Sequence, residues 1–377
     1  MKVSVMQENL AKGLGVVSRA VAGQRAPLPV LTHILLSTDN GRLKIAATNL
    51  ELAINCWIGA KVEGEGAITV PSRTFAELIT LLPSDVVNLD LNVRTQSLRI
   101  LCGRTDNNVK GIDAQEFPII PTFSPNNVAY VDAAVLKKMI AKVVFAAATD
   151  ENRPMLTGVL TKIEGSNLTL AASDGFRVSE CRGQLKSPVG EPIAILIPAK
   201  AVAEVGRLIG EQTEPVAITV TPSGAQALFH LDNIDVVAQL IDQRFPDYAN
   251  VIPRAYNTRT IVNTAELLKA CKQASIFARE SNNLARIAIE PSEDGAGRIR
   301  ITAQAQETGD NQSELEGVVV GPAVEIGFDA RFLVDVASVI DTPQVAIETT
   351  AAKAPGVIRP IGDDSFLHVV MPMHLSR

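Results

Sequence analysis

The sequence is poor in the residues on which metal sites, disulfides and membrane spans depend. Its 377 residues include only four histidines and four cysteines, and neither set has the close spacing of metal ligands or of a disulfide framework. We therefore expect no metal and no cofactor, and four buried thiols in a reducing cytoplasm. No run of eighteen apolar residues occurs, so no membrane span is predicted. Residues 1–5 also lack the apolar core of a signal peptide.

Recognisable catalytic motifs are also missing. The sequence has no glycine-rich phosphate loop, because Gly13-Leu14-Gly15 falls within a helical pattern. Ser173-Asp174-Gly175 could form a nucleophile turn, but no histidine partner is evident, and an ordinary turn is the simpler interpretation. These motifs therefore give no support for an enzyme. An enzyme with a site between domains stays open as a distant alternative, since catalytic partners can converge from remote positions.

The sequence does contain a pattern that occurs three times. Residues 5–12, 131–138 and 262–269 each combine the end of an apolar strand with the start of an amphipathic helix, at intervals of 126 and 131 residues. A period of this length is the size of a whole domain rather than of a solenoid repeat. The sequence therefore predicts three equivalent domains.

The three repeats share the same order of predicted elements beyond this first helix. Turn residues at 39–41, 164–167 and 294–297 separate two apolar segments, as in a hairpin. A second strand-to-helix junction then recurs at 68–79, 195–205 and 325–336. This order predicts an α+β fold with two helices and about eight strands per domain. Polar, proline-containing segments at 121–127 and 253–258 place the domain bounds at 1–125, 126–253 and 254–377.

Charge is distributed unevenly over this pattern. The chain has 35 basic and 41 acidic residues, yet residues 8–20, 132–145 and 264–279 carry net charges of +1, +2 and +2. The remainder therefore carries −11. These charges could simply be the solvated faces of three helices. The same bias on three equivalent helices favours a shared basic surface, which suits a polyanion held through its phosphates without sequence readout.

Several segments, taken together, carry a resemblance to a known family. They are Leu28–Leu31, Arg153–Val159, Ser173–Arg177, Arg244–Tyr248 and Val369–Leu375. In this order, and with three repeats between them, they resemble the bacterial DNA polymerase III beta subunits, or beta sliding clamps, over essentially the whole chain. The resemblance implies the DNA clamp fold and a head-to-tail homodimer that closes as a six-domain ring around duplex DNA. It also implies a non-catalytic role in which the ring tethers the replicative polymerase and confers processivity.

The family's functional positions can be located in this sequence. DNA contacts fall on Arg25, Arg73, Asp150, Pro154 and Met155, and the repeat pattern adds Lys200 as the equivalent of Arg73. The last three of the family positions lack the Gln and Tyr residues that are common there. The expected ring interface joins Arg104 and Val109 of one subunit to Ile276, Phe277, Glu307, Glu314 and Glu316 of the next.

The resemblance further implies a pocket for short apolar peptide motifs of the DNA polymerase III alpha subunit, the clamp loader and repair polymerases. Its expected residues are Leu156, Ser173, Gly175, Phe176, Arg177, Val178, Pro246, Asn250, Val251, Val369, Met371, Pro372, Met373, His374 and Leu375. Phe176 stands where His is common, and Asn250 and His374 stand where Arg is common, so peptide preference is expected to differ. The main alternative is a diverged, clamp-like scaffold that binds partner peptides outside replication.

Overall fold

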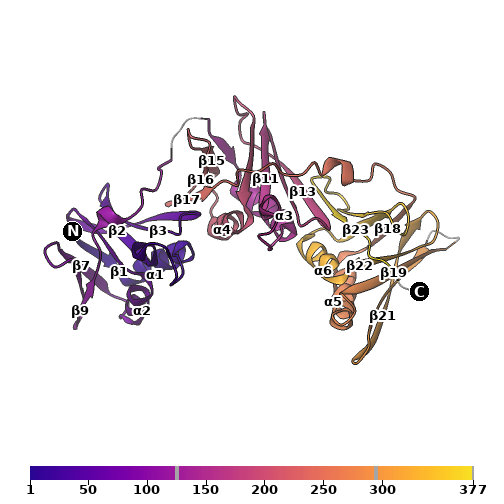
Figure 1. Ribbon diagram of the computed structural model, residues 1–377, viewed down its shortest axis with the longest axis horizontal. Coiled ribbons are helices and arrows are strands. Elements are labelled where there is room, and N and C mark those ends of the chain that lie inside the picture. The colour runs from indigo at the N-terminus through magenta and orange to yellow at the C-terminus, as the bar shows by residue number, and fades with distance from the viewer. Residues whose placement is uncertain (124–126, 293–295, 376–377) are drawn as a thin grey trace. The chain divides into compact units, whose positions relative to one another are not determined.

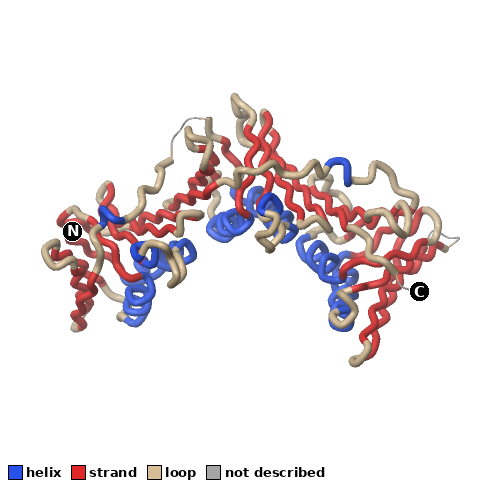
Figure 2. The backbone as a smooth tube through the Cα atoms, viewed as in Figure 1, coloured by secondary structure: helices blue, strands red, loops and turns tan. Residues whose placement is uncertain are grey.

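The computed structural model describes residues 1–123, 127–292 and 296–375. These residues form two compact units, the first made of Met1–Ala134 with Arg207–Leu240 and the second of Val135–Gly206 with Ile241–Arg377. Both units combine helices with antiparallel strands (Figures 1 and 2).

Unit 1 contains two sheets. Its helices are α1 Gln7–Val17 and α2 Ser72–Leu81, and its strands are β1 Lys2–Met6, β2 His33–Asp39, β3 Arg42–Thr48, β4 Leu52–Ile58, β5 Lys61–Gly64, β6 Ala67–Pro71, β7 Val86–Asn92, β8 Ser97–Cys102, β9 Thr105–Lys110, β10 Ala129–Val131, β15 Val216–Val220, β16 Gln226–Leu231 and β17 Ile234–Gln239. One sheet has the order β5-β1-β7-β8-β9, and the other β10-β15-β16-β17-β4-β3-β2-β6. The pairing of β17 with β4 joins the first repeat to the second in one continuous sheet.

Helix α1 packs against β3 and β4 and against α2. Its apolar face, with Leu10, Leu14 and Val17, is buried, as expected for an amphipathic helix on a sheet. At Gly13, an added Cβ would lie only 2.8 Å from Cδ1 of Ile45. This glycine therefore permits the close approach of helix and sheet, which explains why Gly13-Leu14-Gly15 occurs inside a helix.

Unit 2 contains one extended sheet. Its helices are α3 Ala133–Val143 and α4 Ala199–Ile209, whose ends reach unit 1, with α5 Thr264–Ala278 and α6 Ala330–Val339. Its strands are β11 Gly158–Glu164, β12 Asn167–Ser173, β13 Arg177–Gln184, β14 Ile193–Pro198, β18 Thr258–Asn263, β19 Leu284–Pro291, β20 Ala296–Ala305, β21 Gly309–Val320, β22 Val324–Asp329, β23 Gln344–Thr349, β24 Gly356–Pro360 and β25 Phe366–Val370. They follow the order β14-β11-β12-β13-β25-β24-β23-β18-β21-β20-β19-β22, in which β13 and β25 join the second repeat to the third.

Helices α5 and α6 lie side by side, and α5 packs on β19–β21 (Figure 1). Each begins with a side-chain cap: the Asn263 side chain accepts a hydrogen bond from the Glu266 backbone N–H, and Asp329 accepts one from that of Arg331. Such caps satisfy N–H groups that have no partner inside the helix. They fix where both helices start and therefore how their side chains face the sheet.

A buried ion pair connects α3 to the last repeat within unit 2. Lys142 is only 6% exposed, and its Nζ lies 2.7 Å from Oδ2 of Asp363 and 3.8 Å from Oδ1 of Asp341. The ammonium group also lies 5.6 Å from the ring centroid of Phe366. On the same helix, Lys138 pairs with Asp341 at 3.3 Å. The positive charge counted for residues 132–145 is thus partly neutralised, so the expected basic surface is smaller on this helix than the sequence indicates.

The expected repeat architecture is confirmed over the residues that the structure describes. The repeats hold the helix pairs α1/α2, α3/α4 and α5/α6, with strands β1–β9, β10–β17 and β18–β25 respectively. The α+β fold with two helices and about eight strands per repeat is therefore correct. The predicted boundary between residues 125 and 126 lies outside the described residues, as do residues 294 and 295 of the predicted turn at 294–297. The other two residues of that turn begin β20.

All four cysteines are buried free thiols, as the sequence predicts. Burial raises the pKa of Cys56 and Cys181 to about 11 and that of Cys271 to about 12, because a thiolate is poorly solvated in an apolar interior. In the described part of the chain, no helix is both long and apolar enough to cross a membrane. No group of three or more His, Cys, Asp or Glu side chains suited to a metal ion occurs there either.

Candidate peptide-binding pocket

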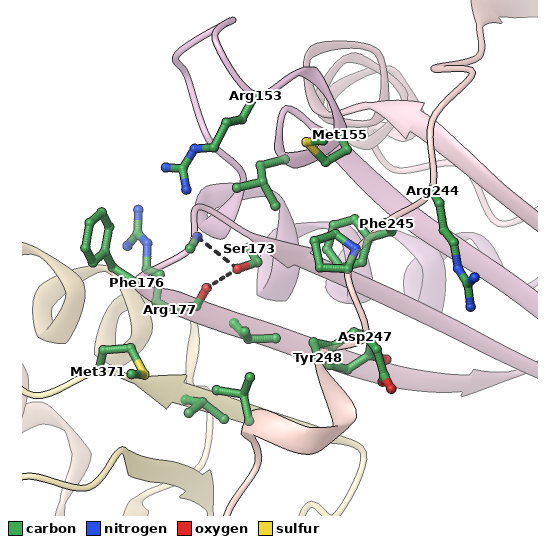
Figure 3. Close-up of a pocket in the computed structure, with 16 residues that line it drawn as sticks. Arg153, Met155, Ser173, Phe176, Arg177, Arg244, Phe245, Asp247, Tyr248 and Met371 are labelled. Atoms are coloured by element: carbon green, nitrogen blue, oxygen red, sulfur yellow. Dashed lines mark hydrogen bonds between the residues drawn. The ribbon is translucent and has the colours of Figure 1, made fainter.

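Unit 2 contains a largely apolar pocket of about 340 Å³. It lies where the β12–β13 turn, the segment 244–251 and the end of β25 meet (Figure 3). Its lining consists of Arg153, Met155, Leu156, Ser173, Gly175, Phe176, Arg177, Val178, Arg244, Phe245, Pro246, Asp247, Tyr248, Val251, Val369 and Met371.

The β12–β13 turn is built by its own side chains. Oγ of Ser173 donates to the carbonyl of Arg177 at 2.7 Å and accepts from the N–H of Gly175 at 3.1 Å. Oδ1 of Asp174 accepts from the N–H groups of Phe176 and Arg177 at 2.9 and 3.1 Å. Gly175 has a φ of +93°, which favours glycine. Ser173-Asp174-Gly175 is therefore a turn, in agreement with the simpler interpretation of the sequence.

Arg177 fixes this turn to the rest of the unit. Its guanidinium donates to Oδ2 of Asp174 at 3.0 Å, to Oδ2 of Asp335 on α6 at 2.6 Å and to the carbonyl of Phe145 at 2.8 Å. It also lies 4.2 Å from the ring centroid of Phe332, within range of a cation–π interaction. With its donors used in this way, Arg177 acts in positioning the pocket.

The floor of the pocket is apolar. Val178 and Val369 are paired across β13 and β25, and Leu156 and Phe245 pack together in a buried cluster beside them. The ring of Phe245 meets that of Tyr248 edge to face, with centroids 6.0 Å apart. A surface of this kind gains free energy by covering apolar groups of a ligand.

Two exposed apolar side chains stand at the rim. Phe176 is 61% exposed and Met371 is 38% exposed, and they lie on the side opposite Phe245 and Tyr248 (Figure 3). The N–H of Met371 donates to the carbonyl of Phe176 at 2.9 Å, so the two rim residues are held together. Exposed large apolar groups beside a pocket are typical of an interaction site.

Tyr248 links the pocket to a buried carboxylate. Its hydroxyl donates to Oε2 of Glu180 at 2.6 Å, and Oε1 of the same carboxylate accepts from Arg182 at 2.8 Å. Burial raises the pKa of Tyr248, and the bond to Glu180 raises it further. The phenol is therefore neutral and held as a hydrogen-bond donor.

Ten of the fifteen residues expected at the pocket line it. The exceptions are Asn250, Pro372, Met373, His374 and Leu375. Asn250 instead donates to Asp247 at 2.8 Å, and the N–H of Met373 donates to the carbonyl of Gly327 at 2.8 Å. Beyond Met371 the tail thus runs along β22, where Leu375 packs close to Gly327.

Six lining residues were not expected there: Arg153, Met155, Arg244, Phe245, Asp247 and Tyr248. All of them belong to the segments Arg153–Val159 and Arg244–Tyr248 that carry the family resemblance. These segments therefore contain a sequence signal that could have identified the six residues. Met155 was expected to contact DNA, and its side chain lies in the wall of the pocket.

The other residues expected to contact DNA are exposed. In unit 1, Arg25 follows α1 in an irregular segment, and Arg73 on α2 pairs with Glu77 at 2.9 Å. In unit 2, Lys200 is the second residue of α4, Asp150 lies in the loop before β11, and Pro154 begins the short 3-10 helix Pro154–Leu156. Their contact with DNA stays a prediction.

The residues expected at the ring interface occupy both units. In unit 2, Ile276 on α5 is 58% exposed and Phe277 is half-buried beside it. Glu314 and Glu316 are exposed on β21, and Glu307 is exposed before it. In unit 1, Arg104 is exposed between β8 and β9, whereas Val109 is buried.

Comparisons with known proteins cover the whole chain. Family models described as the DNA polymerase III beta subunit N-terminal, central and C-terminal domains match residues 1–121, 130–247 and 249–374. The beta sliding clamp of Synechococcus elongatus is 30% identical over 380 residues, and that of Bacillus subtilis is 29% identical over 387 residues. These matches cover 100% and 99% of both chains, respectively.

Solved structures give the same result. The crystal structure of the DNA polymerase sliding clamp from Bacillus subtilis matches with a TM-score of 0.93 at 27% identity. That of the DNA polymerase III subunit beta from Pseudomonas aeruginosa matches with a TM-score of 0.90 at 26% identity. Both alignments cover 100% of each chain. This chain belongs to the beta sliding clamp family, the beta subunits of DNA polymerase III.

Proposed function

We propose that this chain is a non-catalytic processivity factor: two copies close head to tail around duplex DNA and tether a DNA polymerase to its template. The observation that carries the proposal is the full-length match to all three domains of the DNA polymerase III beta subunit. The same match favours a replication clamp over a scaffold that acts outside replication. A topological link explains how a protein of net charge −6 can stay on DNA, because retention then does not depend on strong phosphate binding.

Contact with the duplex would be electrostatic and independent of sequence. Arg25, Arg73 and Lys200 are exposed basic residues that could each meet a phosphate. Phosphate contacts carry no sequence information and are equivalent along the duplex, so the ring can slide. We place Asp150, Pro154 and Met155 near the DNA on the family resemblance alone.

The pocket of unit 2 would hold a short apolar motif of a client. The clients proposed are the DNA polymerase III alpha subunit, the clamp loader and repair polymerases. The support is the apolar floor around Val178 and Val369 together with the exposed rim residues Phe176 and Met371. One pocket shared by several clients would let the ring exchange partners without leaving the DNA.

We further propose the domain bounds 1–125, 126–253 and 254–377 and a location in the cytoplasm. The support for these bounds is the three matched domain ranges, 1–121, 130–247 and 249–374. The location is supported by the replicative family and by four cysteines that all remain free thiols.

Replacing Phe277 by Asp is expected to shift the homodimer toward monomer. The interface proposed here is a contact between unlike surfaces, in which α5 of one subunit meets the β8–β9 region of the next. An added carboxylate beside the exposed Ile276 would be buried without a partner there, which costs several kcal/mol. Sedimentation velocity measures the effect, and Tyr130→Asp, which places the same carboxylate at an aromatic residue on β10 of unit 1, is the control. A fully dimeric Phe277→Asp variant would contradict the interface.

The function is tested by primer extension on a long single-stranded template with a clamp loader and a DNA polymerase III core. Addition of the chain should lengthen the products made in a single binding event, with an excess of unlabelled trap DNA present. Product lengths that are unchanged by the chain, with an active polymerase and loader, would contradict the proposed function.

A further inference from the structure

A second groove adjoins the pocket on the same sheet face. It has a volume of about 510 Å³ and is lined by residues that include Glu180 and Arg182 of β13 and Leu367 of β25. Because side chains two apart on a strand share a face, Val178, Glu180 and Arg182 point to the same side of β13. Val178 lies opposite Val369, and Glu180 lies opposite Leu367, so the two strands carry first the pocket and then the groove.

The wall between the two sites is shared. Tyr248 and Ile252 pack on the buried cluster of Val178, Leu367 and Val369. Tyr248 lines the pocket and Ile252 lines the groove, and Tyr248 donates its hydrogen bond to Glu180 in the groove. A ligand in the pocket therefore has the groove as its immediate neighbour.

Arginine side chains dominate the open part of the groove. Arg182, Arg254 and Arg359 all line it. Arg254 is exposed and, within the described part of the chain, takes part in no hydrogen bond or ion pair. The side chain of Arg182 is 67% exposed and, among the described residues, its guanidinium donates only to Oε1 of Glu180. Arg359 donates through Nε to Glu348 at 3.2 Å, which leaves its terminal nitrogens available.

The carboxylates in and beside the groove neutralise its three arginines only in part. Glu180 is buried, and its two oxygens accept from Tyr248 and from Arg182. Glu348 is shared between Arg359 and Arg259. Asp364 is the exposed carboxylate of the lining. The groove thus offers an excess of guanidinium donors to an incoming ligand.

We propose that this arginine groove binds acidic residues that flank the apolar motif of a client peptide. The inference rests on the proposed function, since it extends the client site of the pocket. Val178 and Arg182 are about 13 Å apart along β13, which an extended peptide covers with about four residues. A client would therefore place its apolar motif in the pocket and a carboxylate about four residues away in the groove.

Carboxylates fit this groove better than a nucleic-acid backbone does. The guanidinium fork matches a carboxylate in a bidentate geometry. A continuous phosphate chain would also have to pass the negative charge of Asp364, and an isolated acidic side chain reaches Arg254 without doing so. Nearness to an apolar pocket on the same strands favours a peptide as well.

The test uses fluorescence anisotropy with the full-length protein and three labelled peptides. One carries an apolar motif alone, one adds Asp and Glu residues at either end, and one adds Asn and Gln instead. The acidic extension should tighten binding about tenfold at low salt relative to the neutral extension. The gain should shrink as ionic strength rises.

Substitutions in the groove then test whether its arginines cause the tighter binding of the acidic peptide. Arg254→Gln removes an arginine that has no partner among the described residues, and Arg359→Gln combined with it should remove most of the gain. Binding of the apolar motif should stay unchanged, because neither arginine bonds to Glu180 or Tyr248. Arg94→Gln, an exposed arginine in the turn between β7 and β8 of unit 1, is the matched control and should retain the gain.

Each outcome separates the two proposals. If the apolar motif alone does not bind, the proposed client pocket is wrong. If that motif binds but the acidic and neutral extensions are equivalent, or the acidic gain survives in the double variant, the groove proposal is overturned. Loss of the gain on addition of single-stranded DNA at equal ionic strength would overturn it in favour of a nucleic-acid ligand.

Discussion

Removal of residues 371–377 is expected to abolish polymerase stimulation and to weaken binding of a client peptide about 100-fold or more. Met371 supplies an apolar side chain at the pocket rim, and its N–H holds the carbonyl of Phe176 at 2.9 Å. The truncation removes the Met371 side chain and leaves the Phe176 carbonyl without this hydrogen bond. Losing the burial of two large apolar side chains accounts for an effect of this size. Primer extension and fluorescence anisotropy measure the two losses.

Strand β25 ends at Val370, so the truncated chain keeps its sheet pairing with β13 and β24. His374→Ala is the matched control, because His374 lies in the deleted segment and is exposed outside the pocket lining. This variant should stimulate the polymerase like the original chain. Full stimulation by the truncated protein would mean that the pocket is not the client site.

Replacing Lys142 by Ala is expected to lower the free energy of unfolding of unit 2 by about 3–5 kcal/mol. The ammonium group is buried, pairs with Asp363 at 2.7 Å and lies over the ring of Phe366. Its removal leaves a carboxylate without its main partner and opens space beside an aromatic ring. Urea unfolding, followed by hydrogen exchange of β25 amides, measures the loss.

Lys138→Ala on the same helix is the matched control. Lys138 is 69% exposed in its side chain and pairs with Asp341 at 3.3 Å, so its loss should cost less than about 1 kcal/mol. If both variants lowered the free energy of unfolding equally, the buried ion pair of Lys142 would not be the source of the stabilisation.

The ion pair also predicts a dependence on pH. Burial opposes ionisation of Asp363, but hydrogen bonds from Lys142 and Ser365 outweigh it and lower its pKa to about 2. A carboxyl whose pKa is lower in the folded state stabilises the fold above its ordinary pKa of 3.8. That stabilisation is lost as pH falls from 3.8 toward 2, and in Lys142→Ala this loss should be smaller.

The repeat in the sequence predicts most of the fold, because both signals behind it are local. Apolar periodicity and turn residues are sufficient to locate the strand-to-helix junctions that begin α1, α3 and α5. The pairings of β17 with β4 and of β13 with β25 join different repeats and have no local signal. They were therefore seen only in the structure.

The direction in which a side chain points is a second feature that the sequence does not predict. Lys142 was counted as part of a basic helix, yet it points into unit 2 and is neutralised by Asp363. Net charge over a segment contains no information on which face each residue occupies. The same holds for Glu180 and Tyr248, whose hydrogen bond joins residues 68 positions apart.

The candidate pocket was predicted in part. Val178 and Val369 line the pocket, whereas Met373 and Leu375 continue along β22 beyond it. The motif at the end of the chain indicates that a site is near, whereas the point at which the tail leaves the pocket is set by the bond between Met373 and Gly327. Only the three-dimensional course of the tail separates these residues.

The proposed ring is held on DNA by topology, and a retention measurement tests this directly. The chain is placed on nicked circular DNA by a clamp loader, separated from free protein, and the circle is then cut once with a restriction enzyme. We expect the protein to stay on the intact circle and to be lost from the ends of the linear DNA. Equal retention on the circular and the linear DNA would contradict it.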